Sequence, residues 1–504
     1  MQPVVCLSSG VLRGEDRRGV SVFRGIPYGT AKRFERAVPA PAWDGVRDAV
    51  CNGPIAVQLG GSISGSEVLG PYFSGGHPEK FGVAEEKQGE DCLALNVLTP
   101  DLAGKKPVLV YIHGGGFSGG SGSLVIGSDD FVREQDVVLV GINHRLNAFG
   151  YLYLADLLPQ YPDAGIVGML DLVLALQWVR DNIAAFGGDP ALVTVLGESG
   201  GGMKISTLLA MPEAAGLFAR AVVESGSDLV GLNTPERAKT ERRAFLQKLG
   251  LTEEEAAQLL TLPAEKIAAA TTGCFWEPVA DGVHLAPNAG RGFYAPGQSK
   301  EIPLMVGSSQ DELAVFLPPE LFGAKNRRDI LERMAKRPLL TPGEAGRLSE
   351  TDMEAVIEVF LQNNPKDDDA EHLFFKMCSM AGRLGGGAFR QAMAASAANT
   401  APVYHYSVSY DAPLPGHDGV RCAWHTADLP LQMRLVLHPE SEEISRTLSA
   451  AVGAFVRTGD PSTASLPWPA FDPTQRLTMV FDDVCRVERD PNAVLRRALE
   501  PGSD

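Results

Sequence analysis

Short apolar runs alternate with longer stretches of mixed polarity along most of the chain. Such runs, bounded by glycines or polar residues, are typical of strands buried in a parallel sheet. The segments with this pattern are residues 108–112, 137–142, 192–196, 221–223, 303–307, 403–408 and 478–481. We expect each of them to form a strand.

Helical patterns lie between these runs. Residues 168–186 predict a helix whose first half is apolar nearly all round and therefore deeply buried, and residues 441–458 predict another. Strands that alternate with helices indicate an α/β fold with a large, mainly parallel central sheet. Residues 235–270 and 327–400 are mostly helical in pattern with charges on one face, so we expect them to form helical cap insertions.

No Pro- or Ser-rich linker, charge block or repeat divides the 504 residues, so we expect one domain over residues 1–504. The formal net charge of −17 would repel phosphate backbones, and nucleic acid is not an expected partner. No apolar run approaches the length of about 18 residues that a membrane span needs. A monomer is the default expectation.

The expected location is the cytoplasm. The first residues lack the basic region and apolar stretch of a signal peptide. Seven cysteines are scattered without a Cys-x-x-Cys pair, and a sparse, odd set is typical of a reducing compartment.

The segment Gly197-Glu198-Ser199-Gly200-Gly201 matches Gly-x-Ser-x-Gly directly after a predicted strand. In that setting the chain turns sharply from strand into helix, and the turn exposes the serine hydroxyl above the sheet. Glycines remove the Cβ atoms that would clash in such a turn. Ser199 is therefore the candidate nucleophile, and it requires a base, an acid and oxyanion donors elsewhere.

A second glycine loop, His113-Gly114-Gly115-Gly116-Phe117, follows the strand that ends at Ile112. Consecutive glycines allow backbone N–H groups to converge on one point, as in the oxyanion loop of esterases. The predicted donors are the amides of Gly115, Gly116 and Gly200. A phosphate-binding loop is the alternative, but no Gly-Lys-Ser/Thr follows. His113 is expected to be a structural residue of the loop.

These segments, with several others in the same order, resemble the type-B carboxylesterases, the family of cholinesterases and bacterial p-nitrobenzyl esterases. The resemblance runs from about residue 10 to residue 481. Its further pieces are Phe23-Arg24-Gly25-Ile26-Pro27-Tyr28, Glu90-Asp91-Cys92-Leu93, Asn143-His144-Arg145-Leu146, Phe186-Gly187-Gly188-Asp189-Pro190, Ser225-Gly226-Ser227, Pro278-Val279-Ala280-Asp281-Gly282 and Arg457-Thr458-Gly459-Asp460-Pro461.

The resemblance implies an α/β-hydrolase fold with its active site in a gorge, and it assigns the rest of a catalytic triad. The acid is Glu312, in a stretch similar to Gly-x-x-x-Asp-Glu-Gly, and Asp311 is the rival that periodicity cannot separate from it. The base is His425, in a stretch similar to His-x-x-Glu-Leu-Pro, with His417 as the alternative. The order Ser, acid, His is the one expected for this fold.

The chain departs from the family pattern at several positions. Gly200 stands where the family often has Ala, which would loosen one oxyanion donor, and Leu313 and Thr426 replace smaller residues. The family's loop cysteine would fall at Ala56, so Cys92 is expected to lack a disulfide partner, with Cys51 as a possible substitute.

By the same resemblance, Ser225 is a candidate for a hydrogen bond to the triad, although a strand-end serine without that role is an equal alternative. Candidate pocket residues are Phe117, Trp276 and Trp424. Aromatic side chains at such positions are as often core packing as substrate contacts. The glycine-rich stretch 53–80, with Tyr72 and Phe73, is a candidate for the mouth of the gorge.

The expected function is hydrolysis of small carboxylic esters through an acyl-enzyme, without a metal or organic cofactor. The same triad could act on an amide or carbamate or transfer the acyl group to an alcohol. A binding protein without catalysis is a third hypothesis, and the presence of all three triad residues disfavours it.

Overall fold

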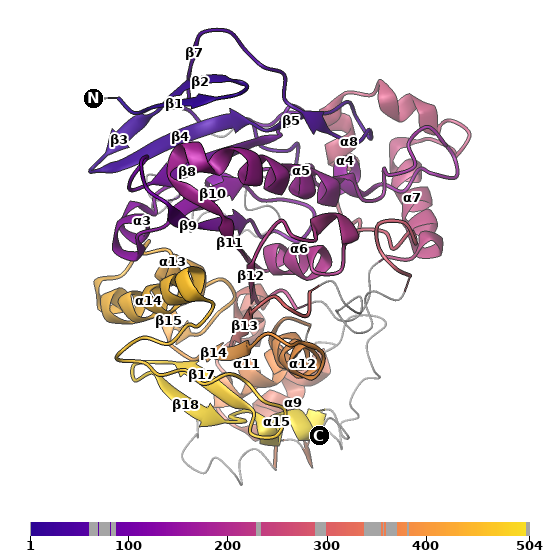
Figure 1. Ribbon diagram of the computed structural model, residues 1–504. Coiled ribbons are helices and arrows are strands. Elements are labelled where there is room, and N and C mark those ends of the chain that lie inside the picture. The colour runs from indigo at the N-terminus through magenta and orange to yellow at the C-terminus, as the bar shows by residue number, and fades with distance from the viewer. Residues whose placement is uncertain are drawn as a thin grey trace.

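A computed structural model describes residues 2–59, 69, 81, 87–227, 233–287, 299–336, 354–355, 357–358, 370–380 and 383–499. Within these ranges an eleven-stranded sheet forms the centre of the molecule (Figure 1). In spatial order its strands are β18 (Arg486–Arg489), β17 (Leu477–Phe481), β14 (Val403–Val408), β13 (Leu304–Ser309), β12 (Arg220–Glu224), β11 (Gly188–Glu198), β9 (Lys106–Ile112), β10 (Val138–Ile142), β8 (Ala94–Thr99), β4 (Val20–Pro27) and β3 (Glu15–Arg17).

The middle of this sheet is parallel. From β10 through β9, β11, β12, β13 and β14 to β17, each strand pairs in parallel with the next, whereas β8, β4, β3 and β18 pair antiparallel at the two edges. The seven predicted strand segments coincide with the seven parallel strands. The predicted α/β fold is therefore confirmed.

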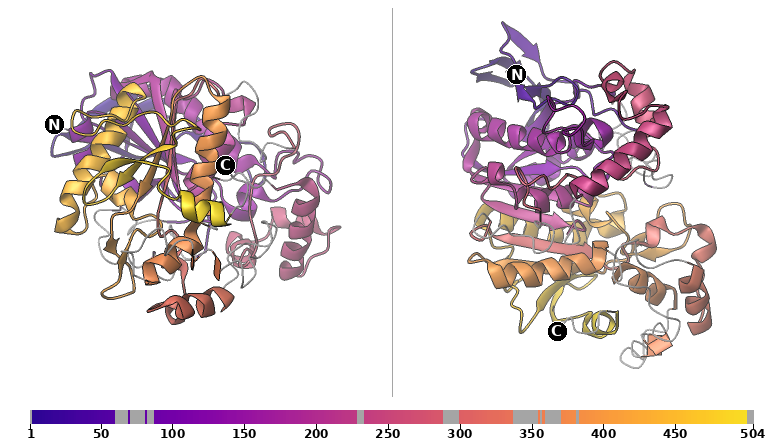
Figure 2. Two further views of the ribbon diagram at one scale, coloured as in Figure 1. Left: turned by 90° about the horizontal axis from the view of Figure 1, so that it is seen from below. Right: turned by 90° about the vertical axis from the view of Figure 1, so that its right-hand side faces the viewer.

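Alternate residues of each central strand supply two separate cores, because successive side chains of a strand point to opposite faces. In β9, Val108, Val110 and Ile112 belong to one core, and Leu109 and Tyr111 belong to the other. The first core is covered by α5 (Val167–Asn182), α6 (Gly200–Leu208) and α12 (Arg383–Ala398). The second is covered by α3 (Asp129–Gln135) and α14 (Glu442–Thr458), and Figure 2 shows these helices flanking the sheet.

The two long helices predicted from periodicity are present, and glycines end both. α5 continues as a 3-10 turn over Ile183–Phe186, and the chain then reverses at Gly187, whose φ is +78°. α14 ends at Gly459 with φ +82°. Glycine adopts this left-handed conformation without the clash that a Cβ atom would cause, so it is the common residue after a helix.

The segments predicted as caps contain α7 (Pro235–Leu249), α8 (Ala264–Ala270), α9 (Arg327–Lys336) and α11 (Ala370–Met380), as well as α12. Alanines of α12 pack into the first core beside β13 and β14, so this helix covers the sheet itself. Much of the range 337–369 lies outside the described residues. No helix in the described ranges has the length and apolar character to cross a membrane.

Candidate active site

The predicted catalytic residues follow three strands in the parallel part of the sheet. Ser199 follows β11, Glu312 lies three residues after β13, and His425 lies beyond β14. The carboxyl ends of parallel strands meet at one edge of the sheet, where α/β proteins place their ligand sites. The fold therefore brings residues that are more than a hundred positions apart in the sequence to one place.

Ser199 occupies a sharp turn between β11 and α6. Its φ is +56° and its ψ is −123°, a conformation that costs a non-glycine residue free energy. Its N–H donates to the carbonyl oxygen of Glu224 at 2.8 Å. A Cβ atom on Gly197 would lie 2.4 Å from the carbonyl carbon of Gly201, and one on Gly201 would lie 2.0 Å from the oxygen of Ile112. Both glycines are therefore needed for the turn to close.

Ser199, His425 and Glu312 are joined by hydrogen bonds. Nε2 of His425 lies 2.8 Å from Oγ of Ser199, and Nδ1 of His425 is hydrogen-bonded to Oε2 of Glu312. The second oxygen of Glu312 accepts from the backbone N–H of Ser309 at 2.8 Å and from the hydroxyl of Ser225. Glu312 and His425 are both buried. These contacts fix the carboxylate and orient the imidazole toward the serine.

Asp311, the rival acid, has a different position. Its Oδ2 accepts from the N–H of Ala423 at 3.0 Å, and its own N–H donates to the carbonyl oxygen of Ala423 at 2.9 Å. Burial raises the pKa of Asp311 to about 7. Asp311 thus ties the end of β13 to the segment just before His425, whereas Glu312 contacts the imidazole.

The other candidate histidines lie elsewhere. The ring of His417 stacks on Phe322 with 3.9 Å between ring centroids. His113 is buried and stacks on His144 with 4.8 Å between centroids, and burial lowers the pKa of His113 to about 3. His113 is therefore neutral at ordinary pH and occupies the structural position in the glycine loop that the sequence predicts.

Carboxylates dominate the electrostatics around His425. Burial disfavours the charged imidazole, but Glu198 and Glu312 more than offset this and raise the pKa of His425 to about 9. Oε1 of Glu198 lies 3.3 Å from Nε2 of His425 and accepts from the hydroxyl of Thr426 at 2.8 Å. Glu198 directly precedes Ser199 in the turn, but it was not among the site residues predicted from the sequence.

The two segments of the predicted oxyanion hole touch each other. Gly115 and Gly116 have φ values of +79° and +58°, and a Cβ atom on Gly200 would lie 2.3 Å from both N and O of Gly116. The loop thus uses the space that an alanine at position 200 would fill. Among the described residues, no group accepts a hydrogen bond from the N–H of Gly115, Gly116 or Gly200. These three donors are therefore available to an oxyanion.

Two of the three candidate pocket aromatics are buried against other rings. Phe117 packs edge-on against Tyr151 with 5.1 Å between centroids. Trp276 packs in the same way against Phe245 of α7 at 5.4 Å. Phe117 is the last residue of the predicted oxyanion loop, so the chain itself places it near the site, whereas Trp276 belongs to the layer formed with α7.

Trp424 is a core residue. It is 1% exposed, and its indole N–H donates to the carbonyl oxygen of Pro413 at 3.0 Å. The interpretation of Trp424 as a pocket residue is therefore replaced by the alternative of core packing, because the side chain is enclosed on all sides. Tyr72 and Phe73, the candidates for the gorge mouth, lie outside the described residues.

The cysteines form no disulfide. None of the seven is in a disulfide; Cys92 is buried and Cys51 is exposed. Burial raises the pKa of the Cys92 thiol to about 12, so this group stays protonated. The structure agrees with the expectation that Cys92 lacks a partner, and the possible substitute Cys51 does not pair with it.

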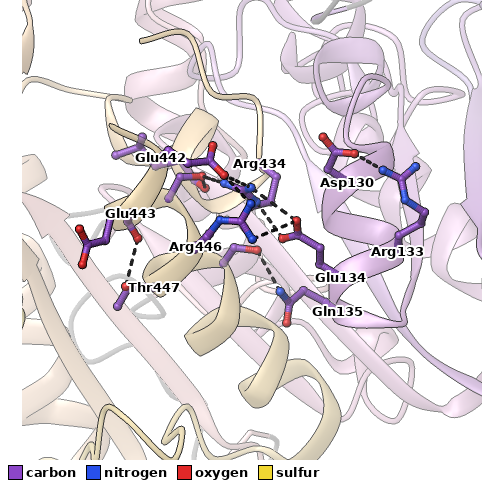
Figure 3. Close-up of polar contacts among 12 residues, drawn as sticks. Asp130, Arg133, Glu134, Gln135, Arg434, Glu442, Glu443, Arg446 and Thr447 are labelled. Atoms are coloured by element: carbon purple, nitrogen blue, oxygen red, sulfur yellow. Dashed lines mark hydrogen bonds and ion pairs between the residues drawn. The ribbon is translucent and has the colours of Figure 1, made fainter. Parts of the chain in front are cut away.

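The segment after His425 is anchored by a buried arginine. α13 (Asp428–Gln432) begins three residues after His425, and Arg434 lies two residues beyond the end of α13 with a φ of +58°. Its guanidinium donates to Glu134 of α3 at 2.8 Å, and to Glu442 at 2.7 Å and Ser445 at 2.8 Å in α14 (Figure 3). Arg434 therefore fastens the histidine segment to two helices on one face of the sheet.

Comparisons with known proteins identify the family of this chain. Residues 1–494 match the model of the carboxylesterase family. The chain is 32% identical to para-nitrobenzyl esterase of Bacillus subtilis, over 99% of this chain and 98% of that protein, and 32% identical to phenmedipham hydrolase of Pseudarthrobacter oxydans, over 99% of both. A crystal structure of a Geobacillus stearothermophilus carboxylesterase superposes with a TM-score of 0.80 at 34% identity, covering 99% of this chain and all of that one. The chain therefore belongs to the carboxylesterase family and is a carboxylic ester hydrolase with the α/β-hydrolase fold.

Proposed function

We propose that this carboxylesterase cleaves its ester by transferring the acyl group to Ser199. His425 takes the proton of the Ser199 hydroxyl as the oxygen attacks the ester carbonyl carbon. Glu312 holds the imidazole in the required tautomer and stabilises its positive charge. The same His425 then donates the proton to the departing alcohol, which leaves an acyl-enzyme.

The amides of Gly115, Gly116 and Gly200 stabilise the negative charge on the carbonyl oxygen in this cycle. Each donor of this kind contributes about 3–4 kcal/mol to transition-state stabilisation. Water activated by His425 then attacks the acyl-enzyme through a second oxyanion and releases the acid. Every step uses side chains and amides of this chain, without a metal or organic cofactor.

One observation carries the proposal: the unbroken series of contacts from Oγ of Ser199 to Nε2 of His425, at 2.8 Å, and from Nδ1 of His425 to Glu312. A general base needs a distance of about 2.6–3.2 Å to the group it deprotonates. The seven free thiols support the prediction of a reducing, cytoplasmic location. The monomeric state remains a prediction.

The experiment that tests the assignment of the base compares two histidine variants. We expect His425→Ala to lower kcat for p-nitrophenyl acetate by about four orders of magnitude or more, because serine then has no proton acceptor. His417→Ala is the matched control and should retain most of the activity, since His417 packs on Phe322. The reverse result would move the base to position 417.

Hydrolysis of an amide or carbamate, or acyl transfer to an alcohol, remains a prediction for the same triad. An amide differs from an ester in its leaving group, and a carbamate differs in its acyl part. Acyl transfer differs from hydrolysis only in the second half of the cycle, where an alcohol instead of water attacks the acyl-enzyme. Initial rates with p-nitrophenyl acetate, p-nitroacetanilide and a p-nitrophenyl carbamate would rank the substrate classes. A chain that neither hydrolyses these compounds nor reacts with an organophosphate would instead fit the hypothesis of a binding protein.

A further inference from the structure

A fully buried lysine lies behind the predicted oxyanion hole and has no part in the proposed cycle. Lys204 is on α6, five residues after Ser199, and is 0% exposed. Burying an ammonium group costs free energy unless other groups compensate for the lost water. The position of Lys204 in the helix that begins at the nucleophile therefore requires an explanation from its contacts.

Lys204 contacts both ends of the oxyanion loop. Its Nζ donates a hydrogen bond to the carbonyl oxygen of His113 at 2.8 Å and lies 5.6 Å from the centroid of the Phe117 ring. A cation within about 6 Å of a ring centroid is attracted to the ring face. His113 is the first residue of the loop and Phe117 the last, so Gly115 and Gly116 lie between the two contacts.

No carboxylate among the described residues makes direct contact with the amine of Lys204. Within the described residues, no carboxylate lies within ion-pair distance of Nζ, and Glu198 acts on it only at longer range. The imidazoles of His113 and His144 are neutral, since burial first and then the Lys204 charge lower the pKa of each. Burial also lowers the pKa of Lys204 to about 7.

The helix and the loop also meet directly at the other end of the predicted hole, where Gly200 touches Gly116. Lys204 lies one turn further along the same helix. α6 therefore contacts the loop at two points, through Gly200 and through Lys204. A shift of the loop relative to α6 would separate the amides of Gly115 and Gly116 from that of Gly200. The relative position of the three donors thus depends on what fastens the loop to the helix.

We propose that Lys204 is a positioning residue of the oxyanion hole, which holds the loop 113–117 against α6 so that its amides and that of Gly200 face one point. The proposal rests on the proposed function of these amides. Lys204 does not touch the substrate. Its loss should therefore weaken binding of the oxyanion and leave binding of the uncharged ester nearly unchanged.

The test uses Lys204→Met, which removes the donor and the charge, and Lys204→Gln, which keeps a donor. Thr207→Ser, on the same helix, is the control, because Thr207 donates to Met203 within α6. For each variant we would measure kcat and KM for p-nitrophenyl acetate, per active site titrated with diethyl p-nitrophenyl phosphate. We would also measure the Ki of a trifluoromethyl ketone, whose adduct with a serine places an oxyanion in the hole.

We expect Lys204→Met to lower kcat about 10- to 100-fold and to weaken the ketone by a similar factor, with KM changed by less than about threefold. Lys204→Gln should give an intermediate loss, and Thr207→Ser should match the unaltered chain. Unchanged kcat and Ki per titrated site in both Lys204 variants would overturn the proposal, even if Tm fell. A loss of kcat without weaker binding of the ketone would overturn it as well. An unaltered chain without turnover or titratable sites would instead refute the serine mechanism.

Discussion

The carboxylates around His425 have two opposing effects at the scale of single residues. In the proposed cycle, Glu198 and Glu312 stabilise the imidazolium that forms when His425 takes the serine proton. The same charges keep a proton on the resting imidazole and reduce the fraction that can act as a base. The sequence alone gives only the unperturbed histidine pKa of about 6.5.

The pH profile should report this environment. Because only neutral His425 can accept the serine proton, kcat/KM should rise with pH through an apparent pKa above 6.5, toward the value of about 9 given by the surrounding carboxylates. Glu198→Gln removes one of these charges and should lower that apparent pKa. Stopped-flow or initial-rate profiles of both chains from pH 5 to 10 measure it. A flat profile from pH 5 to 8, or the same apparent pKa in both chains, would contradict this account.

The two adjacent acids should differ sharply when each is made neutral. Glu312→Gln should lower kcat by about three to four orders of magnitude, because the amide would favour the wrong imidazole tautomer. Asp311→Asn keeps an oxygen that can accept from the N–H of Ala423 and should retain most of the activity. Steady-state kinetics with p-nitrophenyl acetate measure both variants. A larger loss in Asp311→Asn would make Asp311 the acid.

At the scale of elements, the predicted active site depends on loops that the sheet and helices hold in place. Arg434 links α13 to α3 and α14, and its side chain is 4% exposed, whereas Glu134 and Glu442 are 34% and 43% exposed. Because Arg434 is buried, its attraction to the two carboxylates is strong. Because the carboxylates are partly exposed, water can solvate them when the arginine is removed.

Arg434→Met should therefore destabilise the fold by about 2–3 kcal/mol, near the low end for a broken buried ion pair. Arg446→Met is the control, because Arg446 pairs with the same Glu442 but is 62% exposed, and an exposed pair contributes at most about 1 kcal/mol. Urea unfolding followed by circular dichroism measures both. Equal losses of stability in the two variants would show that burial of Arg434 does not matter.

The sequence predicted the central elements because their patterns are local. The seven strands and the two long helices each follow from apolar runs or helical periodicity within the segment itself. Contacts between segments were not predictable in this way. Periodicity could not tell that α12 covers the sheet, that Trp424 is enclosed in the core, or which of Asp311 and Glu312 reaches His425.

Lys204 and Glu198 were missed for the same reason, although each left a signal. Lys204 is the one charged residue in α6, whose other residues are glycines, apolar residues, Ser206 and Thr207. A single charge in such a helix indicates a buried partner. Glu198 occupies the variable position of the nucleophile turn, where its side chain leaves the end of a strand at the catalytic edge of the sheet.

At the scale of the whole molecule, the cysteines allow a test that covers both cores, because buried cysteines lie in each of them. Denatured, unreduced protein should react with seven equivalents of Ellman's reagent per chain, since all seven thiols are free. Native protein should react fastest at Cys6 and Cys51, the two exposed thiols. Absorbance at 412 nm against time gives the total number of reactive thiols in the denatured protein and the rate of the fastest reaction in the native protein. Fewer than seven equivalents in the denatured protein would show that a disulfide forms.

The central claim, that Ser199 is the nucleophile, is tested most directly by covalent labelling. Diethyl p-nitrophenyl phosphate should release one equivalent of p-nitrophenolate per chain, and mass spectrometry should place the diethylphosphoryl group on Ser199. Ester hydrolysis should disappear in step with labelling, and Ser199→Ala should fold normally, release nothing and hydrolyse p-nitrophenyl acetate at near-background rate. A label on another residue, or hydrolysis that persists in Ser199→Ala, would contradict the account.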